Sequence, residues 1–219
     1  MYSLVRPVPH PSPGPRRVVA AFDVDRTLTT RDCVTPFLWR AAGIRLVLAL
    51  VRGPLALLTA LARRDRDLLK ELACGALRGR DGAALDRLGG EFAAEVATRW
   101  LRDDTVARLR RHRELGHTVI LASASLDTYL VPFGERLGVD AVICSRLERD
   151  AGGRLTGRLA GANCRGVEKA RRVREWLDGV GLTDASLWAY GDSADDAPLL
   201  ESAEHPVWVD RARLGAEPR

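Results

Sequence analysis

The sequence has few aromatic side chains and no cluster of basic ones. Only 5% of its 219 residues are aromatic, although the formal net charge at pH 7 is +5. Proteins that bind nucleic acid typically gather basic residues on one face and stack bases on aromatic rings. In this chain the positive charge comes mainly from arginines scattered through helical stretches. We therefore expect no nucleic-acid partner, whereas a basic surface would attract anionic substrates or lipid head groups.

The chain also lacks closely spaced cysteines. Its four cysteines, Cys33, Cys74, Cys144 and Cys164, lie far apart and form no CxxC pair. This spacing argues against a zinc site and against a disulfide framework. The pattern suits a reducing cytosol, so we expect a cytoplasmic protein.

The first apolar run is too short for a signal peptide. Arg16 and Arg17 precede Val18–Phe22 and superficially resemble a twin-arginine signal, but Asp23 ends the apolar run. Residues 1–15 contain five prolines and are expected to form a flexible tail, as are residues 211–219.

Two α/β segments enclose a helical one. Residues 33–103 show helical periodicity and no strand pattern, which predicts an all-helical block. In residues 16–32 and 104–210, short β-branched or apolar runs alternate with helical stretches. That alternation is typical of a parallel sheet with right-handed crossovers, so the predicted class is α/β.

The most apolar part of the helical block, residues 44–62, is nearly long enough to cross a bilayer. A span takes about 20 apolar residues, but Arg45, Arg52 and Gly53-Pro54 interrupt this run. Two buried helices of a helical subdomain are the expected structure. Peripheral membrane contact, with arginines on lipid phosphates, is the main alternative.

Three predicted strands end in acidic or hydroxyl side chains. Val18–Phe22 leads into Asp23 and Asp25, and two later strands lead into Ser123 and Asp192. Ligands bind beyond the carboxyl ends of strands in an open α/β sheet, so we expect these side chains to meet. Paired carboxylates at such a place are costly unless a cation lies between them. A hard divalent cation together with a phosphate group would offset that cost.

Each polar residue also has a purely structural alternative. Ser123 could cap a helix, and Lys169 could be a solvated helix lysine. Arg165, one turn before Lys169, could bind phosphate instead. Asp195 and Asp196 could simply stabilise a helix N-terminus.

The order of the motifs resembles that of the haloacid dehalogenase superfamily of aspartyl phosphatases. The four strings are FDVDRTLT, VILASAS, VEKA and GDSADDAPLL. The fuller strings SASLDTYL and LTGRL, with Asn163-Cys164, resemble subfamily IB, which contains phosphoserine phosphatase. The resemblance covers about Val18 to Val209. It implies a Rossmann-like hydrolase core, residues 16–32 and 104–210, with an inserted helical cap at residues 33–103.

The resemblance also implies a chemistry for the aspartates. Asp23 would attack phosphorus to give an aspartyl-phosphate, and Asp25 would protonate the leaving group and then activate water. Mg²⁺ would be held by Asp23, the backbone carbonyl of Asp25, and Asp192.

The remaining matched residues would bind or position the phosphoryl group. Ser123 would donate a hydrogen bond to a phosphoryl oxygen, and Lys169 would neutralise charge on phosphate and nucleophile. Asp196 would orient Lys169 or a metal-bound water from outside the ligand shell.

The chain departs from this pattern in two places. Arg26 stands where many relatives have glycine, and it would either point away or reach a substrate anion. Ser123-Ala-Ser replaces the Ser-Gly-Gly of phosphoserine phosphatases, which weakens a phosphoserine interpretation because glycines there let backbone approach a small substrate. Asp32 could contact a substrate amine or cap a helix.

The expected function is magnesium-dependent hydrolysis of a small or lipid-linked phosphomonoester. The same residues would support a phosphotransferase that passes the phosphoryl group to a second alcohol. A non-catalytic membrane-associated protein on this fold is the third alternative, but the full set of polar motif residues argues against it. The physiological substrate depends on the cap, and the oligomeric state is left open.

Overall fold

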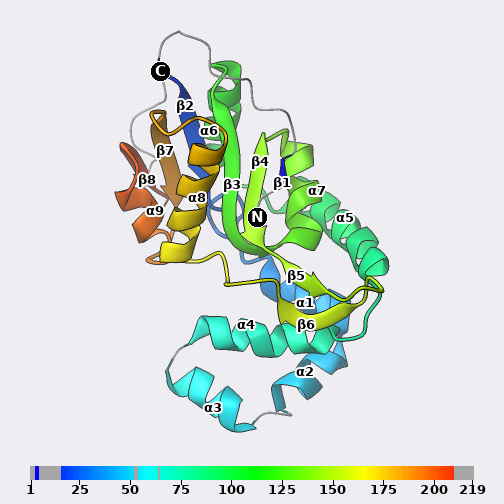
Figure 1. Ribbon diagram of the computed structural model, residues 1–219. Helices are drawn as coiled ribbons and strands as arrows, with labels where there is room; N and C mark the ends of the chain where they lie inside the picture. The colour runs from blue at the N-terminus through cyan, green and yellow to red at the C-terminus, as the bar shows by residue number, and fades with distance from the viewer. Residues whose placement is uncertain (1–2, 5–15, 52–53, 64, 210–219) are drawn as a thin grey trace.

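The apolar segment Val18–Phe22 forms an inner strand of the central sheet in the computed structural model, which describes residues 3–4, 16–51, 54–63 and 65–209 (Figure 1). The sheet strands are β1 (Ser3–Leu4), β2 (Val18–Phe22), β3 (Thr118–Leu126), β4 (Ala141–Ser145), β7 (Ser186–Gly191) and β8 (His205–Trp208). Their order is β1-β4-β3-β2-β7-β8, and every neighbouring pair is parallel except β1 with β4. The predicted α/β class with a Rossmann-like parallel sheet is confirmed.

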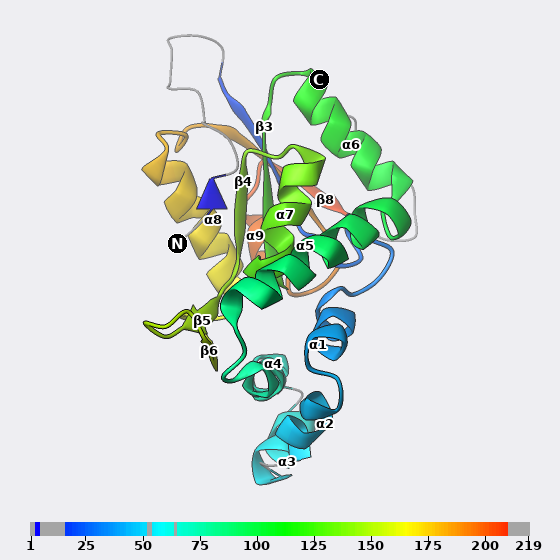
Figure 2. The same ribbon diagram turned by 90° about the vertical axis from the view of Figure 1, so that its right-hand side faces the viewer.

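Helices cover both faces of the sheet (Figures 1 and 2). They are α6 (Asp103–Glu114), α7 (Asp127–Leu137), α8 (Val167–Gly179) and α9 (Ala197–Glu201). Successive side chains of a strand face opposite ways. Val19 and Ala21 therefore pack in the core formed with α8 and α9, whereas Ala20 and Phe22 pack in the core formed with α6 and α7. The result is a three-layer arrangement with the carboxyl ends of the parallel strands at one edge.

The chain between β2 and α6 contains helices and, within its described part, no β-strand. The helices are α1 (Val34–Ala42), α2 (Ile44–Val51), α3 (Pro54–Ala62), α4 (Arg66–Cys74), the short 3-10 helix η1 (Gly75–Leu77) and α5 (Gly82–Arg99). Both views place α2 and α3 at the end of the molecule farthest from the sheet (Figures 1 and 2). No helix of the described ranges combines the length and the apolar composition that crossing a bilayer requires.

An aromatic cluster ties part of this helical block to the core. The Phe92 ring of α5 lies 5.3 Å from the Tyr129 ring of α7 and 5.4 Å from the Phe37 ring of α1, measured between ring centroids. Trp100 completes the cluster at 5.3 Å from Phe92. Aromatic pairs at such separations add to the free energy of burial. The cap as a separate body remains a proposal, and α2, α3 and α4 are the part that projects from the core.

Residues 147–159 form a hairpin of β5 (Leu147–Arg149) and β6 (Leu155–Leu159). It lies within the segment predicted as core, yet its backbone bonds reach the helical block. The amide of Gly79 donates to the carbonyl of Leu155 at 2.7 Å, and the amide of Leu155 donates to the carbonyl of Arg80 at 2.9 Å. The hairpin therefore extends the helical block beside the active-site edge of the sheet.

Two boundaries differ from the sequence-based expectation. Ser3–Leu4, predicted as part of a flexible tail, pairs antiparallel with β4 in the register Ser3↔Val142, while residues 1–2, 5–15 and 210–219 lie outside the described ranges. The strand predicted to end at Ala122 continues to Leu126, with a register shift after Ser123. That irregularity lets the strand carry hydroxyl side chains past the expected loop.

Two adjacent glycines of α5 test how closely this helix packs on α7. A Cβ at Gly89 would lie 2.1 Å from the backbone oxygen of Thr128, whereas a Cβ at Gly90 meets nothing within 4 Å. We expect Gly89→Ala to lower the free energy of unfolding by about 1–3 kcal/mol through overpacking. Gly90→Ala should raise it by about 0.5–1 kcal/mol, because alanine suits a helix interior better than glycine. Urea unfolding of the two variants measures both, and equal effects would contradict the close contact.

Candidate active site

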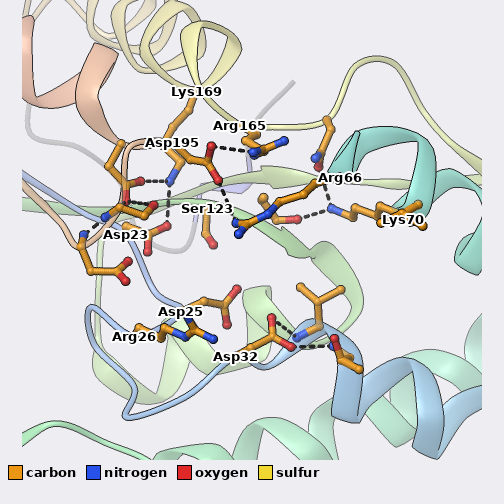
Figure 3. A pocket seen from close by; sticks show the side chains of 18 of the residues that line it. Asp23, Asp25, Arg26, Asp32, Arg66, Lys70, Ser123, Arg165, Lys169 and Asp195 are labelled. Atoms are coloured by element: carbon orange, nitrogen blue, oxygen red, sulfur yellow. Dashed lines mark hydrogen bonds and ion pairs between the residues drawn. The ribbon is translucent and has the colours of Figure 1, made fainter. Parts of the chain in front are cut away.

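The strand-end residues predicted to meet do line one cavity. Asp23 follows β2, Ser123 lies in β3 and Asp192 follows β7, and all three border a cavity of about 460 Å³ (Figure 3). Ser123 is 1% exposed and its Oγ accepts a hydrogen bond from the amide of Ser125 at 3.2 Å. Because α7 begins only at Asp127, Ser123 is not its cap, and that structural alternative is wrong.

Lys169 joins two buried carboxylates at the floor of the cavity. Its Nζ donates to Asp23 Oδ1 at 2.7 Å and to Asp196 Oδ1 at 2.5 Å, and all three side chains are buried. Burial alone lowers the pKa of Lys169, but the two carboxylates outweigh it and raise that pKa above its usual range. Lys169 is therefore an ammonium group, not the solvated lysine considered as an alternative.

The loop after β7 holds Asp196 in place. Its Oδ2 accepts hydrogen bonds from the amides of Asp192 and Ser193 at 3.2 and 3.1 Å, and from the Ser193 hydroxyl at 2.9 Å. A Cβ at Gly191 would lie 2.4 Å from the Cβ of Asp196, so only glycine allows this approach. Asp196 contacts Lys169, and its role in orienting Lys169 or a metal-bound water remains a prediction.

Asp25 occupies a different environment from Asp23. Its Oδ1 accepts the amide of Cys33 at 2.8 Å, and its Oδ2 accepts the hydroxyl of Ser125 at 2.8 Å. Tyr129 in turn donates to Ser125 Oγ at 2.7 Å. Burial and the nearby charge of Asp32 raise the pKa of Asp25, while these two hydrogen bonds oppose the rise. A raised pKa makes a carboxyl group a better proton acceptor, and the hydrogen bonds limit that rise.

The acidic cluster suits a hard divalent cation. Oxygens of Asp23, Asp192 and Asp196 lie within 4.8 Å of one another, and burial raises the pKa of Asp23 to about 7 despite Lys169. Carboxylate oxygens are the ligands that Mg²⁺ prefers. Both oxygens of Asp196 already accept hydrogen bonds, so Asp23 and Asp192 are the better candidate ligands. A role for the Asp25 carbonyl remains a prediction.

Two basic residues of α4, Arg66 and Lys70, line the cavity but were not predicted as site residues from the sequence. Lys70 is 9% exposed, and its Nζ donates to the carbonyl of Ala124 and to Asn163 Oδ1, the latter at 2.7 Å. Arg66 reaches Asp195 at 3.3 Å. A clue was present, because the chain has only two lysines, Lys70 and Lys169, among 34 basic residues. Both line the cavity.

Arg165 and Asp195 form an ion pair at the rim instead of binding the nucleophile. Arg165 Nη2 donates to Asp195 Oδ1 at 2.6 Å, and Asp67 lies 3.6 Å from the same guanidinium. Burial tends to raise the pKa of Asp195, but Arg165 and Arg66 outweigh it and lower that pKa. Lys169, which contacts Asp23 directly, occupies the position predicted for charge neutralisation.

Two residues left open by the sequence are now placed. Asp32 caps α1 by accepting the amides of Val34 and Thr35 at 3.4 and 3.0 Å, although it also borders the cavity. Arg26 is exposed, lines the cavity and has φ of 64°, a left-handed conformation that costs a non-glycine residue energy. Its charge lowers the pKa of Asp192, against the dominant effect of burial. Arg26 therefore faces the site.

Comparison with known proteins agrees with this geometry. The sequence profile of the haloacid dehalogenase-like hydrolase family matches residues 20–201. The protein CicA of Caulobacter vibrioides is 36% identical over 193 residues, covering 87% of this chain and 85% of CicA. This chain belongs to the haloacid dehalogenase-like hydrolase family, and it is an enzyme of that class.

One solved structure and one further sequence relative are also similar to this chain. A protein of unknown function from Bordetella pertussis Tohama I has a crystal structure with a TM-score of 0.67 and 27% identity, covering 85% of this chain and 87% of that one. The phosphoserine phosphatase of Archaeoglobus fulgidus is 28% identical over 83% of this chain but only 49% of its own length. The family and the fold are thereby shown.

Loss of charge should destabilise the fold much more at Lys169 than at Lys70. Lys169→Met leaves Asp23 and Asp196 without their cation, so we expect unfolding free energy at pH 8 to fall by about 3–5 kcal/mol. The loss should shrink toward pH 5. Without Lys169 the pKa values of the two carboxyl groups are higher in the folded protein than in the unfolded chain, so their cost to stability grows as pH rises above the unfolded pKa. Urea unfolding across this pH range measures the effect.

Lys70→Met is the matched control. Lys70 bonds neutral acceptors, and burial lowers its pKa, so the change should cost less than about 1 kcal/mol. Similar losses for both variants would contradict the assigned ion network.

Proposed function

We propose that this chain is a magnesium-dependent phosphomonoester hydrolase that acts through an aspartyl-phosphate on Asp23. The observation that carries the proposal is the ion network at the cavity floor, where Lys169 holds Asp23 at 2.7 Å and Asp196 at 2.5 Å. Lys169 fixes one oxygen of Asp23 and lowers the pKa of Asp23 against the rise caused by burial, which favours the ionised nucleophile. The phosphatase named among the relatives, from Archaeoglobus fulgidus, is consistent with this chemistry.

The first step would form a bond between a carboxylate oxygen of Asp23 and phosphorus. The bond from phosphorus to the substrate's alcohol oxygen breaks, and Asp25, whose pKa burial raises, gives a proton to that oxygen. Ser123 Oγ, buried at the cavity wall, donates a hydrogen bond to a phosphoryl oxygen. Lys169 stabilises the negative charge that remains.

The second step would reverse the role of Asp25. Its carboxylate takes a proton from water as the water oxygen bonds to phosphorus, and the bond from phosphorus to Asp23 breaks. Inorganic phosphate leaves, and Asp25 is protonated again. Bound between Asp23 and Asp192, Mg²⁺ would supply charge neutralisation for an anionic nucleophile and an anionic phosphate.

The cavity favours a substrate with a second anionic group and some apolar surface. Its lining includes the cationic residues Arg66, Lys70 and Arg165 and the apolar residues Leu38 and Leu69. We propose a small or lipid-linked phosphomonoester, and the lipid-linked form includes membrane contact through residues 44–62. Phosphoserine fits less well, because Asp32, the acid available for its amine, already caps α1.

We expect Asp23→Asn to lower hydrolysis of p-nitrophenyl phosphate at least about a thousandfold, because the nucleophile is lost. Asp178→Asn, at an exposed position of α8 outside the cavity, is the matched control and should retain activity. EDTA should abolish wild-type activity and added Mg²⁺ should restore it. Wild-type rates in Asp23→Asn would refute the proposed nucleophile.

Ser125→Ala tests the second role of Asp25. The Ser125 hydroxyl stabilises the Asp25 carboxylate, so its loss raises the pKa of Asp25 further. The acid limb of the kcat–pH profile should then move to higher pH by about 1 unit, because breakdown of the intermediate needs the carboxylate.

Tyr129→Phe and Ser202→Ala provide the comparison for this experiment. Tyr129 touches Ser125 but not Asp25, so its removal should move the limb less; Ser202, at the end of α9, should not move it. An unmoved acid limb in Ser125→Ala would show that Asp25 is not the base.

A further inference from the structure

The exposed apolar side chains of this protein gather on two helices. Among the described residues, ten large apolar side chains are exposed, and seven of them belong to α2 and α3. The other three are scattered over α1, α8 and β8. The seven are Ile44, Val47, Leu48, Val51, Leu55, Leu58 and Leu61, here called the α2–α3 face. A concentration of this kind marks an interaction site more often than chance exposure does.

The solvent-facing side of α2 and α3 is apolar, unlike that of most surface helices. In α2, Leu46 is buried against the rest of the protein, yet Ile44 and Leu48 are 67% and 46% exposed. Among the α3 residues whose burial is described, only Ala60 is fully buried, and Leu55 is 79% exposed. A surface helix normally presents charged residues to water on this side. Both helices are thus apolar on the inside and on the outside.

The segment that carries the α2–α3 face has charge of one sign, and the next acidic residues along the chain are Asp65, at the N-cap of α4, and Asp67 and Glu71 within α4. From residue 33 to residue 64 the chain contains five arginines and no aspartate or glutamate. Arg45 at the start of α2 and Arg63 just after α3 are both exposed. Apolar side chains flanked by arginines match an anionic lipid surface, whose acyl boundary accepts the former and whose phosphates pair with the latter.

A second copy of this chain fits the same face poorly. Self-association would bring Arg45 and Arg63 against the same segment of a second copy, which contains no acidic residue, and like charges across an interface disfavour binding. The helices, of eight and nine residues, are also too short to span the hydrocarbon core. We propose that the α2–α3 face docks this protein on the surface of an anionic bilayer, lying in the interface.

Docking would place the active-site cavity beside the membrane. α4 lies next to α2 and α3 at the projecting end of the molecule and contributes Arg66, Leu69 and Lys70 to the cavity wall (Figures 1 and 2). Only the lipid-linked form of the proposed substrate depends on this arrangement. The binding itself rests on the surface and requires no catalysis.

The test is co-sedimentation of the full chain with phosphatidylcholine vesicles, with and without phosphatidylglycerol, in the absence of any phosphomonoester. We expect binding that increases with phosphatidylglycerol and weakens at high salt. Leu55→Glu/Leu58→Glu should weaken partitioning at least about tenfold, since both leucines are exposed and would otherwise be buried in the interface. Arg45→Ala/Arg63→Ala should weaken it about fivefold per arginine on anionic vesicles only.

The matched control replaces two exposed apolar residues elsewhere by glutamate. Val167→Glu/Trp208→Glu makes the same change in charge and should bind vesicles like the wild type. An equal loss of vesicle binding in this control would show that the effect comes from the change in net charge alone, and it would overturn the proposal. So would absence of sedimentation on anionic vesicles, or a dimer in solution that Leu55→Glu/Leu58→Glu converts to monomers. None of these results bears on p-nitrophenyl phosphate hydrolysis, so docking and catalysis fail separately.

Discussion

The site depends on one buried ammonium group between two buried carboxylates. Without Lys169, Asp23 and Asp196 would be two desolvated acids in one pocket, which folding tolerates only if they take up protons. With it, one oxygen of Asp23 is fixed while the carboxylate still borders the cavity. Gly191 matters for the same reason, because it leaves room for the side chain that holds the lysine from behind.

Residues that follow strands could be predicted, because a parallel sheet brings their carboxyl ends together whatever lies between them in sequence. That rule, with the motif order, placed Asp23, Ser123 and Asp192 in one cavity. Lys70 could not be found this way, since its partner Asn163 lies 93 residues away and no periodic pattern links a helix of the cap to that loop. Ser125 was noted only for not being glycine, although its hydroxyl binds Asp25.

The helical block shows a different limit of sequence patterns. Apolar periodicity correctly predicted helices over residues 44–62, but it does not distinguish an apolar side chain that meets the core from one that meets solvent. Two buried helices were expected, and the structure leaves most of their large side chains exposed. Whether a side chain is buried depends on the residues that pack against it, and α2 and α3 project from the core, where few residues cover them.

The helical block and the hairpin β5–β6 come from separate stretches of the chain but are joined by backbone hydrogen bonds. Backbone bonds of Gly79, Arg80 and Gly82 with residues 153–155 join two stretches of chain that lie about 70 residues apart in the sequence. A transplant of residues 33–103 into a related hydrolase would therefore carry unpaired backbone groups at one seam. In modular terms, the unit that evolution or a protein engineer can exchange is the helical block together with its hairpin.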